Sequence, residues 1–226
     1  MALGIGQSST AVAQLNTTIT TSAVTTAATG STFVIYVCLP NSVVAPTVSD
    51  NKSNTYVQKR TVSYNSSSAS LWLFTCENGA GGSGHTATIT EASSATLEMF
   101  FVEITGSGGY GTLDVSADGG TGGNFTASMA TPSITTTANG DVVISFFGGT
   151  NADLTTITDS YSNVLQKQLL GTTNQACGAV GGLSQSSSGA TSDTFTLSAA
   201  VFGNTMIAAW KFFGTSANNQ IMWIRA

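Results

Sequence analysis

The amino-acid sequence predicts an all-β protein made of two similar antiparallel β-sandwich units, Ig-like or jelly-roll-like, with an extended N-terminal arm. Three observations support this prediction. The chain repeats itself, its polar residues are mostly Thr, Ser and Gly, and apolar residues alternate with polar ones in several segments. A repeated unit of roughly 90 to 100 residues has the size of one small sandwich.

The internal repeat consists of four segments that recur in the same order. Residues 33–37, 48–54, 85–90 and 103–106 return at 142–146, 157–163, 193–198 and 211–214. The offset between the copies drifts by only one or two residues, so the units should fold alike. We therefore expect Asp50 and Asp159 in equivalent turns, and Phe33 and Val142 on equivalent strands.

The strands follow from short apolar or alternating runs separated by turn residues. In the first unit they are expected at residues 17–21, 33–39, 47–50, 54–61, 70–76, 86–90 and 97–104. Thr86 to Thr90 alternates strictly, which is the period of a half-buried strand. The full division is an arm at 1–16, a first unit at 17–106, a Gly-rich connection at 107–124, and a second unit with its tail at 125–226. No amphipathic helix is expected.

Composition narrows the possible functions. Only 8% of the residues are charged, against about 25% in an average soluble domain, so the surface must consist largely of Thr, Ser, Asn and Gly. The net charge is −5 and the six basic residues are scattered, which argues against nucleic-acid binding. The N-terminus lacks the features of a signal peptide, and no segment approaches membrane-spanning length. We expect neither export by the secretory route nor a membrane partner.

The order of these segments resembles β-sandwich proteins encoded by bacteria and their phages, which carry a duplicated Asp-Ser-x-Gly-Asn, Glu-Tyr-Ser-Gly and Leu-Asp pattern. The matching positions here are Asp50 and Asn54, Trp72, and residues 86–90, 103–106 and 113–114. Ser53 and Ser162 stand where that pattern has a turn glycine. The resemblance implies a sandwich fold and no particular chemistry.

No catalytic or metal-binding motif is expected. Asp50 and Asn54 are interpreted as caps of their own turn, because a calcium loop would need further carboxylates. His85, the single histidine, lacks a partnered nucleophile and is interpreted as a solvated residue at the end of a loop. Asp114 and Asp118 beside the glycine-rich loop are the weaker alternative for a metal. We expect no enzyme activity, no cofactor and no metal.

The three cysteines cannot form a closed disulfide framework. Cys38, Cys76 and Cys177 are interpreted as buried free thiols, since free cysteine is among the most buried residue types. A Cys38–Cys76 bridge is the alternative, and both residues are expected on neighbouring strands.

The resulting hypothesis is a non-enzymatic structural protein of a bacteriophage virion, specifically a capsid decoration or cement protein. Its expected partners are the major capsid protein or another virion protein, with homo-oligomers in the assembly. The attachment device is expected in the arm, where Leu3 and Ile5 would anchor and Gly4 and Gly6 would allow close approach. The alternative is a receptor-binding or tail-fibre head module that recognises a surface glycan, with Tyr110 stacking on a sugar. Trp72 is assigned to the core.

Overall fold

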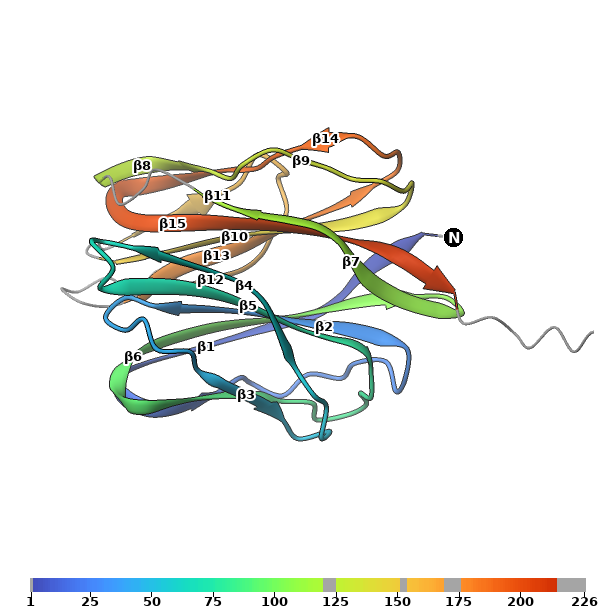
Figure 1. Ribbon diagram of the computed structural model, residues 1–226, viewed down its shortest axis with the longest axis horizontal. Helices are drawn as coiled ribbons and strands as arrows, with labels where there is room; N and C mark the ends of the chain where they lie inside the picture. Colours follow the sequence, from blue (N-terminus) through green and yellow to red (C-terminus); the bar gives the residue numbers. More distant parts are fainter. Residues whose placement is uncertain (1, 120–124, 151–153, 169–175, 215–226) are drawn as a thin grey trace, which may run out of the picture.

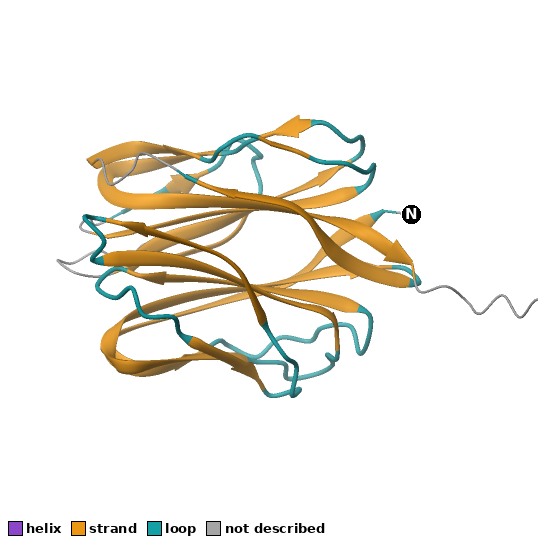
Figure 2. Cartoon of the chain, viewed as in Figure 1, coloured by secondary structure: helices purple, strands orange, loops and turns teal. Residues whose placement is uncertain are grey.

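The computed structural model describes residues 2–119, 125–150, 154–168 and 176–214. Figure 2 shows that the regular elements are strands, and no helix occurs among the described residues. The all-β prediction is confirmed. None of the described segments could cross a membrane as a helix. The predicted C-terminal tail at residues 215–226 lies outside the described residues.

The strands form two large antiparallel sheets and one small one. They are β1 (Leu3–Thr20), β2 (Ser31–Leu39), β3 (Thr47–Asp50), β4 (Val57–Tyr64), β5 (Ala69–Gly79), β6 (Ala87–Gly106), β7 (Gly109–Asp118), β8 (Phe125–Ala130), β9 (Ile134–Thr135), β10 (Asp141–Thr150), β11 (Ile157–Thr158), β12 (Val164–Gln168), β13 (Ala176–Gln185), β14 (Ala190–Thr191) and β15 (Thr194–Gly214). The first sheet has the order β1-β6-β2-β5-β4, with β3 also on β6. The second has the order β11-β15-β10-β13-β12, with β7 and β8 also on β15. Strands β9 and β14 pair with each other.

Long curved strands turn each sheet into two layers. The second half of β6 pairs with β2, whereas its first half pairs with β3 and with the end of β1. Strand β15 does the same in the second unit, pairing with β10 in one half and with β8 and β11 in the other. Figure 1 shows the resulting stack, with β3 at one outer side and β8, β9 and β14 at the other. The two units therefore merge into one stacked body.

The central core lies between the two inner layers and receives side chains from both units. Its largest members are buried aromatic residues, with Tyr36 and Phe100 from the first unit and Phe146 and Trp210 from the second. The ring of Phe146 lies 4.9 Å from that of Tyr36 and 5.6 Å from that of Phe100. Each unit also has its own outer core on the far face of its inner layer. Strands β2 and β10 are buried on both faces, which explains their continuous apolar runs.

Strand pairing corrects two of the predicted segment boundaries. The expected arm at 1–16 is wrong, because residues from Leu3 onward form β1 and pair with β6 along its whole length. The expected Gly-rich connection at 107–124 is also wrong over residues 109–118, which form β7 on β15. Strands β7 and β8 together repeat the role of β1, so each unit begins with a long edge strand.

Pairing also fixes the offset between the repeats. Asp50 and Asp159 occupy equivalent turns, in which Ser53 and Ser162 both have positive φ values, of 61° and 57°. Serine thus adopts the left-handed conformation that glycine would take with less strain. Phe33 and Val142 do lie on equivalent strands, but Val142 matches Val34, since both face the central core while Phe33 faces the outer core. The predicted alignment was one residue out of register here.

Side chains join the units at both lateral edges. On one side the Arg60 guanidinium of β4 donates to the Ser116 hydroxyl at 3.2 Å and to its carbonyl at 2.7 Å, and it pairs with Asp118. On the opposite side the Gln166 amide of β12 donates to the Ser8 hydroxyl of β1 at 3.1 Å. Edge β4 thus meets β7 of the second unit, and edge β12 meets β1 of the first. These contacts protect strand edges that would otherwise be open to pairing with another chain.

Candidate functional site

The Asp50 turn is a dense polar network. Oδ1 of Asp50 accepts hydrogen bonds from the backbone N–H groups of Lys52 at 2.9 Å and Asn54 at 3.0 Å. Its Oδ2 accepts from the Asn54 amide at 2.7 Å and the Tyr56 hydroxyl at 2.9 Å. Burial raises the pKa of the Asp50 carboxyl, but these hydrogen bonds outweigh it and the net direction is down. The predicted turn-capping role is confirmed by these contacts.

His85 is buried at the centre of this network, so the expectation of a solvated histidine is wrong. Its Nε2 lies 3.0 Å from Oδ2 of Asp50, and its Nδ1 lies 3.0 Å from the Thr26 hydroxyl. The imidazole also stands edge-on against the rings of Phe33 and Phe101. Sequence reasoning missed these contacts because Thr26 and Asp50 are 59 and 35 residues away from His85.

The Asp50–His85–Thr26 chain has the residue types of a hydroxyl-based nucleophilic site but not its accessibility. His85 is 0% exposed and Thr26 is 4% exposed, so a substrate cannot reach the hydroxyl. The Thr26 oxygen also accepts a hydrogen bond from the N–H of Gly82 at 3.0 Å. The network therefore fastens the loops around residues 21–30 and 80–86 to the turn at Asp50.

Two of the three buried glutamates of β6, Glu98 and Glu103, have opposite environments. Glu103 is satisfied, accepting from Ala27 N–H at 2.8 Å, the Ser31 hydroxyl at 2.7 Å and Gln7 N–H at 3.1 Å. Glu98 is completely buried, and neither of its oxygens has a geometrically sound hydrogen-bond partner. Burial raises the pKa of the Glu98 carboxyl well above its usual range. The two residues lie on opposite faces of β6, Glu98 on the side of Cys38 in the central core and Glu103 on the side of Phe33.

The cysteines are buried free thiols, as expected. The predicted proximity of Cys38 and Cys76 is wrong, since Cys38 faces the central core and Cys76 the outer core. Cys38 instead lies 3.3 Å from the Tyr64 hydroxyl. Burial raises the pKa of the Cys38 and Cys177 thiols, which leaves them protonated and poorly reactive.

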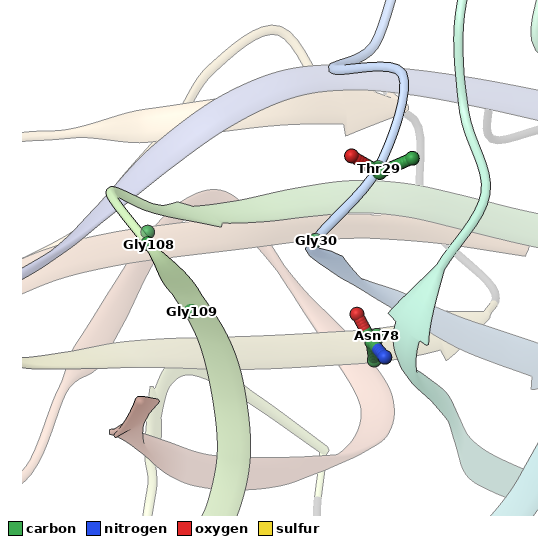
Figure 3. A pocket seen from close by; sticks show the side chains of 6 residues that line it. Thr29, Gly30, Asn78, Gly108 and Gly109 are labelled. Carbon is green, nitrogen blue, oxygen red and sulfur yellow. The ribbon is translucent and has the colours of Figure 1, made fainter. Parts of the chain in front are cut away.

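A small hollow occurs where the two units meet at one end of the stack. Its volume is about 240 Å³, and it is lined by Thr29, Gly30, Asn78, Gly106, Gly108 and Gly109. Figure 3 shows the side chains of Thr29 and Asn78 beside the turn that carries Gly108 and Gly109. Backbone groups and two polar side chains could bind a small polar ligand here, but no ionisable side chain lines the hollow.

Tyr110 lies in β7 rather than in a loop. It is partly buried and pairs across the strands with Phe213, whose ring is 5.4 Å away and whose residue is 52% exposed. Phe213 was not predicted as a site residue because β7 was interpreted as a loop, which hid the pairing. The pair forms an aromatic surface next to the strand ends that border the hollow.

The residues predicted for partner binding lie inside the sheet of the same chain. Leu3 is 4% exposed and belongs to the central core, and Ile5 packs against that core. Gly4 and Gly6 approach β6 closely, and a Cβ at Gly6 would come within 2.5 Å of Glu103. These four residues bind the chain's own β6, so they do not form an attachment arm.

Nowhere in the described residues do three or more His, Cys, Asp or Glu side chains gather in an arrangement suited to a metal ion. The comparisons with known proteins give no relative: no family model, no curated protein and no solved structure matches this chain.

Proposed function

We propose that this chain is a non-enzymatic structural protein of a bacteriophage virion, a decoration protein on the outer surface of the capsid. One observation carries the proposal: the Asp50, His85 and Thr26 network, whose residue types suit chemistry, is buried and fastens loops. What the protein offers to its surroundings is a stacked β body with a weakly charged surface rich in Thr and Ser.

The stacked architecture supports this role. A central core shared by both units makes them one mechanical body, and side chains close both lateral edges. The segment order that resembles phage β-sandwich proteins points in the same direction. Since β1 belongs to the body, attachment to a capsid must use the sandwich faces or loop ends.

Quantification of purified virions tests the proposal. We expect the protein at a fixed stoichiometry with the major capsid protein, and density for the stacked sandwich on the outside of the shell in electron micrographs. Absence of the protein from particles would overturn the structural role altogether.

A glycan-recognising head module is the second candidate, and the Tyr110–Phe213 pair favours it. Exposed aromatic rings stack on the apolar faces of sugars, and the neighbouring hollow offers polar groups. A glycan array on the full chain tests this reading, with Tyr110→Ala as the variant and Tyr56→Phe as a control far from the pair. Saturable binding that Tyr110→Ala abolishes, together with a few copies at the tail, would replace the capsid role by this one.

A further inference from the structure

The equivalent turns of the two units differ in how their aspartates are satisfied. In the first unit, Oδ2 of Asp50 receives donors from Asn54, Tyr56 and His85. In the second, Oδ1 of Asp159 accepts from Asn163 N–H at 2.9 Å, but Oδ2 has no hydrogen-bond partner. Asp159 is only 9% exposed, so bulk water does not compensate for the missing partners.

All three donors to Asp50 Oδ2 are lost in the second unit. The Asn163 amide donates instead to the Gly182 carbonyl at 2.9 Å. Leu165 follows Asp159 by six residues, as Tyr56 follows Asp50, but it is apolar and packs against the central core. Asp193 occupies the position of His85. A basic imidazole beside the first carboxylate is thus replaced by a second carboxylate.

The second unit also places three oxygens around one glycine of β13. Gly181 stands where the first unit has Trp72, and it pairs with Ser145 of β10. The position of an ideal Cβ on Gly181 is 2.3 Å from Asp159 Oδ2, 2.7 Å from the Ser145 hydroxyl and 2.9 Å from Asp193 Oδ2. Any side chain here would collide with these oxygens, so glycine is what lets them converge.

Asp193, unlike Asp159, has hydrogen-bond donors at both of its oxygens. Its Oδ1 accepts from the Ser160 hydroxyl and N–H and from its neighbour Thr194, at 2.7–2.9 Å, and its Oδ2 accepts from Ser145 at 2.5 Å. Among the described residues, no Lys, Arg or His forms an ion pair with Asp159 or Asp193. Two carboxyl groups therefore share this buried place without a cationic side chain beside them.

We propose that Asp159 Oδ2, Asp193 Oδ2 and the Ser145 hydroxyl bind a hard cation of the calcium class, which would be the partner of Asp159 Oδ2 as the His85 imidazole is a partner of Asp50 Oδ2. Carboxylate and hydroxyl oxygens are the ligands that such cations prefer, and waters would complete the coordination. The ion would enter from the hollow of about 340 Å³ that Asp159 itself lines with Ile157, Thr158, Ser162 and Val164. This inference goes beyond the structural role proposed above. It also revises the sequence-based expectation of no metal.

The sequence around the Asp159 turn does not reveal Asp193 as a second ligand. A calcium loop carries its acids within about 12 residues, whereas Asp193 follows Asp159 by 34 positions and reaches it only through the pairing of β11 with β15. A site with few protein ligands and two carboxylates should bind weakly, with a Kd on the order of 10⁻⁴–10⁻³ M.

Thermal unfolding of the full chain tests the proposal. Protein stripped with EDTA and desalted is titrated with CaCl₂, MgCl₂ or NaCl at pH 7.5 and constant ionic strength. We expect calcium to raise the Tm, by about 5–10 °C at 100 times its Kd, and titration calorimetry to give one site per chain. An identical Tm in EDTA and in saturating amounts of each cation would overturn the proposal.

Two variants in the second unit and one in the first make the test specific. Asp159→Asn and Asp193→His should both abolish the calcium-dependent rise, the second by rebuilding the Asp–His pair of the first unit. Asp50→Asn, the matched control, should lower the Tm but keep the full calcium-dependent rise. A rise that persists in both second-unit variants would show that calcium acts elsewhere, and the proposal fails.

A proton could satisfy Asp159 in place of a cation. Burial is the main cause that raises the pKa of its carboxyl, and the nearby Asp193 raises it further. That outcome has its own signature. Cations would leave the wild type unchanged, while Asp159→Asn would be more stable than the wild type at pH 7.5 and equally stable at pH 4. This result would also overturn the cation site.

Discussion

The two units share their strand order but fill their outer layers differently. The outer core of the first unit is one continuous cluster that includes the rings of Phe33, Trp72, Phe74 and Phe101. The outer side of the second unit contains two smaller clusters, and on this face of β13 Gly181 stands where the first unit has Trp72. Buried polar groups occupy space that aromatic rings fill in the first unit.

This difference shows that the fold requires a well-packed central core but tolerates different outer layers. Both units contribute large side chains to the central core, and each inner layer is buried on two faces. The outer layers can diverge because each packs only against its own inner layer. Aromatic packing gives the first unit more buried apolar surface, whereas glycine gives the second unit room for its carboxylates.

Removal of the first edge strand should have the largest effect. Deleting residues 2–15 removes Leu3 from the central core and opens β6 over its whole second half, so we expect no cooperative folding at 25 °C. Circular dichroism and urea unfolding measure this. Leu15→Asn is the control, because Leu15 is 78% exposed with a φ of 48°, a conformation that asparagine accepts more readily. A deletion variant with the wild-type spectrum and midpoint would mean that β1 is the arm expected from sequence.

Truncation of a large side chain in the central core should cause the second-largest loss of stability. Trp210 is 0% exposed and lies among side chains of both units, so Trp210→Ala should cost about 3–5 kcal/mol. Both units should still unfold in one transition, because this core is common to them. Urea unfolding followed by circular dichroism checks both points.

Trp210→Phe is the matched control for that loss. It keeps an aromatic ring and removes an indole N–H that has no hydrogen-bond partner, so it should cost less than the alanine variant. Two separate transitions in Trp210→Ala would show that the units fold independently, contrary to a shared core.

A pH effect should distinguish the units at one pair of equivalent positions. Asp141 of the second unit occupies the place of Phe33 and is fully buried, with both oxygens lacking a hydrogen-bond partner. Burial, with a further contribution from the charge of Asp114, raises the pKa of Asp141 from 3.8 to about 6. Its folded-state pKa is above the unfolded one, so its contribution to stability is complete below about pH 3.8 and is lost as the pH rises through about 6.

Asp141→Asn removes this titration while keeping the shape of the side chain. The urea midpoint of the wild type should fall between pH 4 and pH 7 more steeply than that of the variant. Asp114→Asn serves as the comparison, because hydrogen bonds from Thr137 and the ion pair with Lys211 lower the pKa of Asp114. Equal slopes in the wild type and Asp141→Asn would exclude Asp141 as a source of the pH dependence.

The sequence predicted strands well where one face is buried and the other is exposed. Alternation at Thr86 to Thr90 reports one buried face directly, and the repeat showed that the units fold alike. The apolar run of β2 could not fix the register, because a strand buried on both faces does not alternate. This is why Val142 was matched with Phe33 instead of Val34.

Other features depend on contacts that no local pattern contains. Strand β1 starts with small residues such as Gly4 and Gly6 and has no clear period, since it is held by β6 almost 100 positions away. His85 looked exposed because its polar partners are distant in sequence. Each error arose where long-range pairing outweighed local composition.

The smallest expected effect concerns the outermost face. The hydroxyls of Thr20 on β1 and Thr88 on β6 are 2.9 Å apart on an exposed surface, so Thr20→Ala should cost roughly 0.2–1 kcal/mol. The equivalent residues of the second unit are Ser128 and Thr196, which pair across β8 and β15. Ser128→Ala should cost still less, because serine lacks the β-branched methyl group that favours a strand. Urea midpoints of both single variants, and of Thr20→Ala with Thr88→Ala combined, measure the pair. A loss above about 1 kcal/mol in Thr20→Ala would show that the outer layer contributes more than a cross-strand pair accounts for.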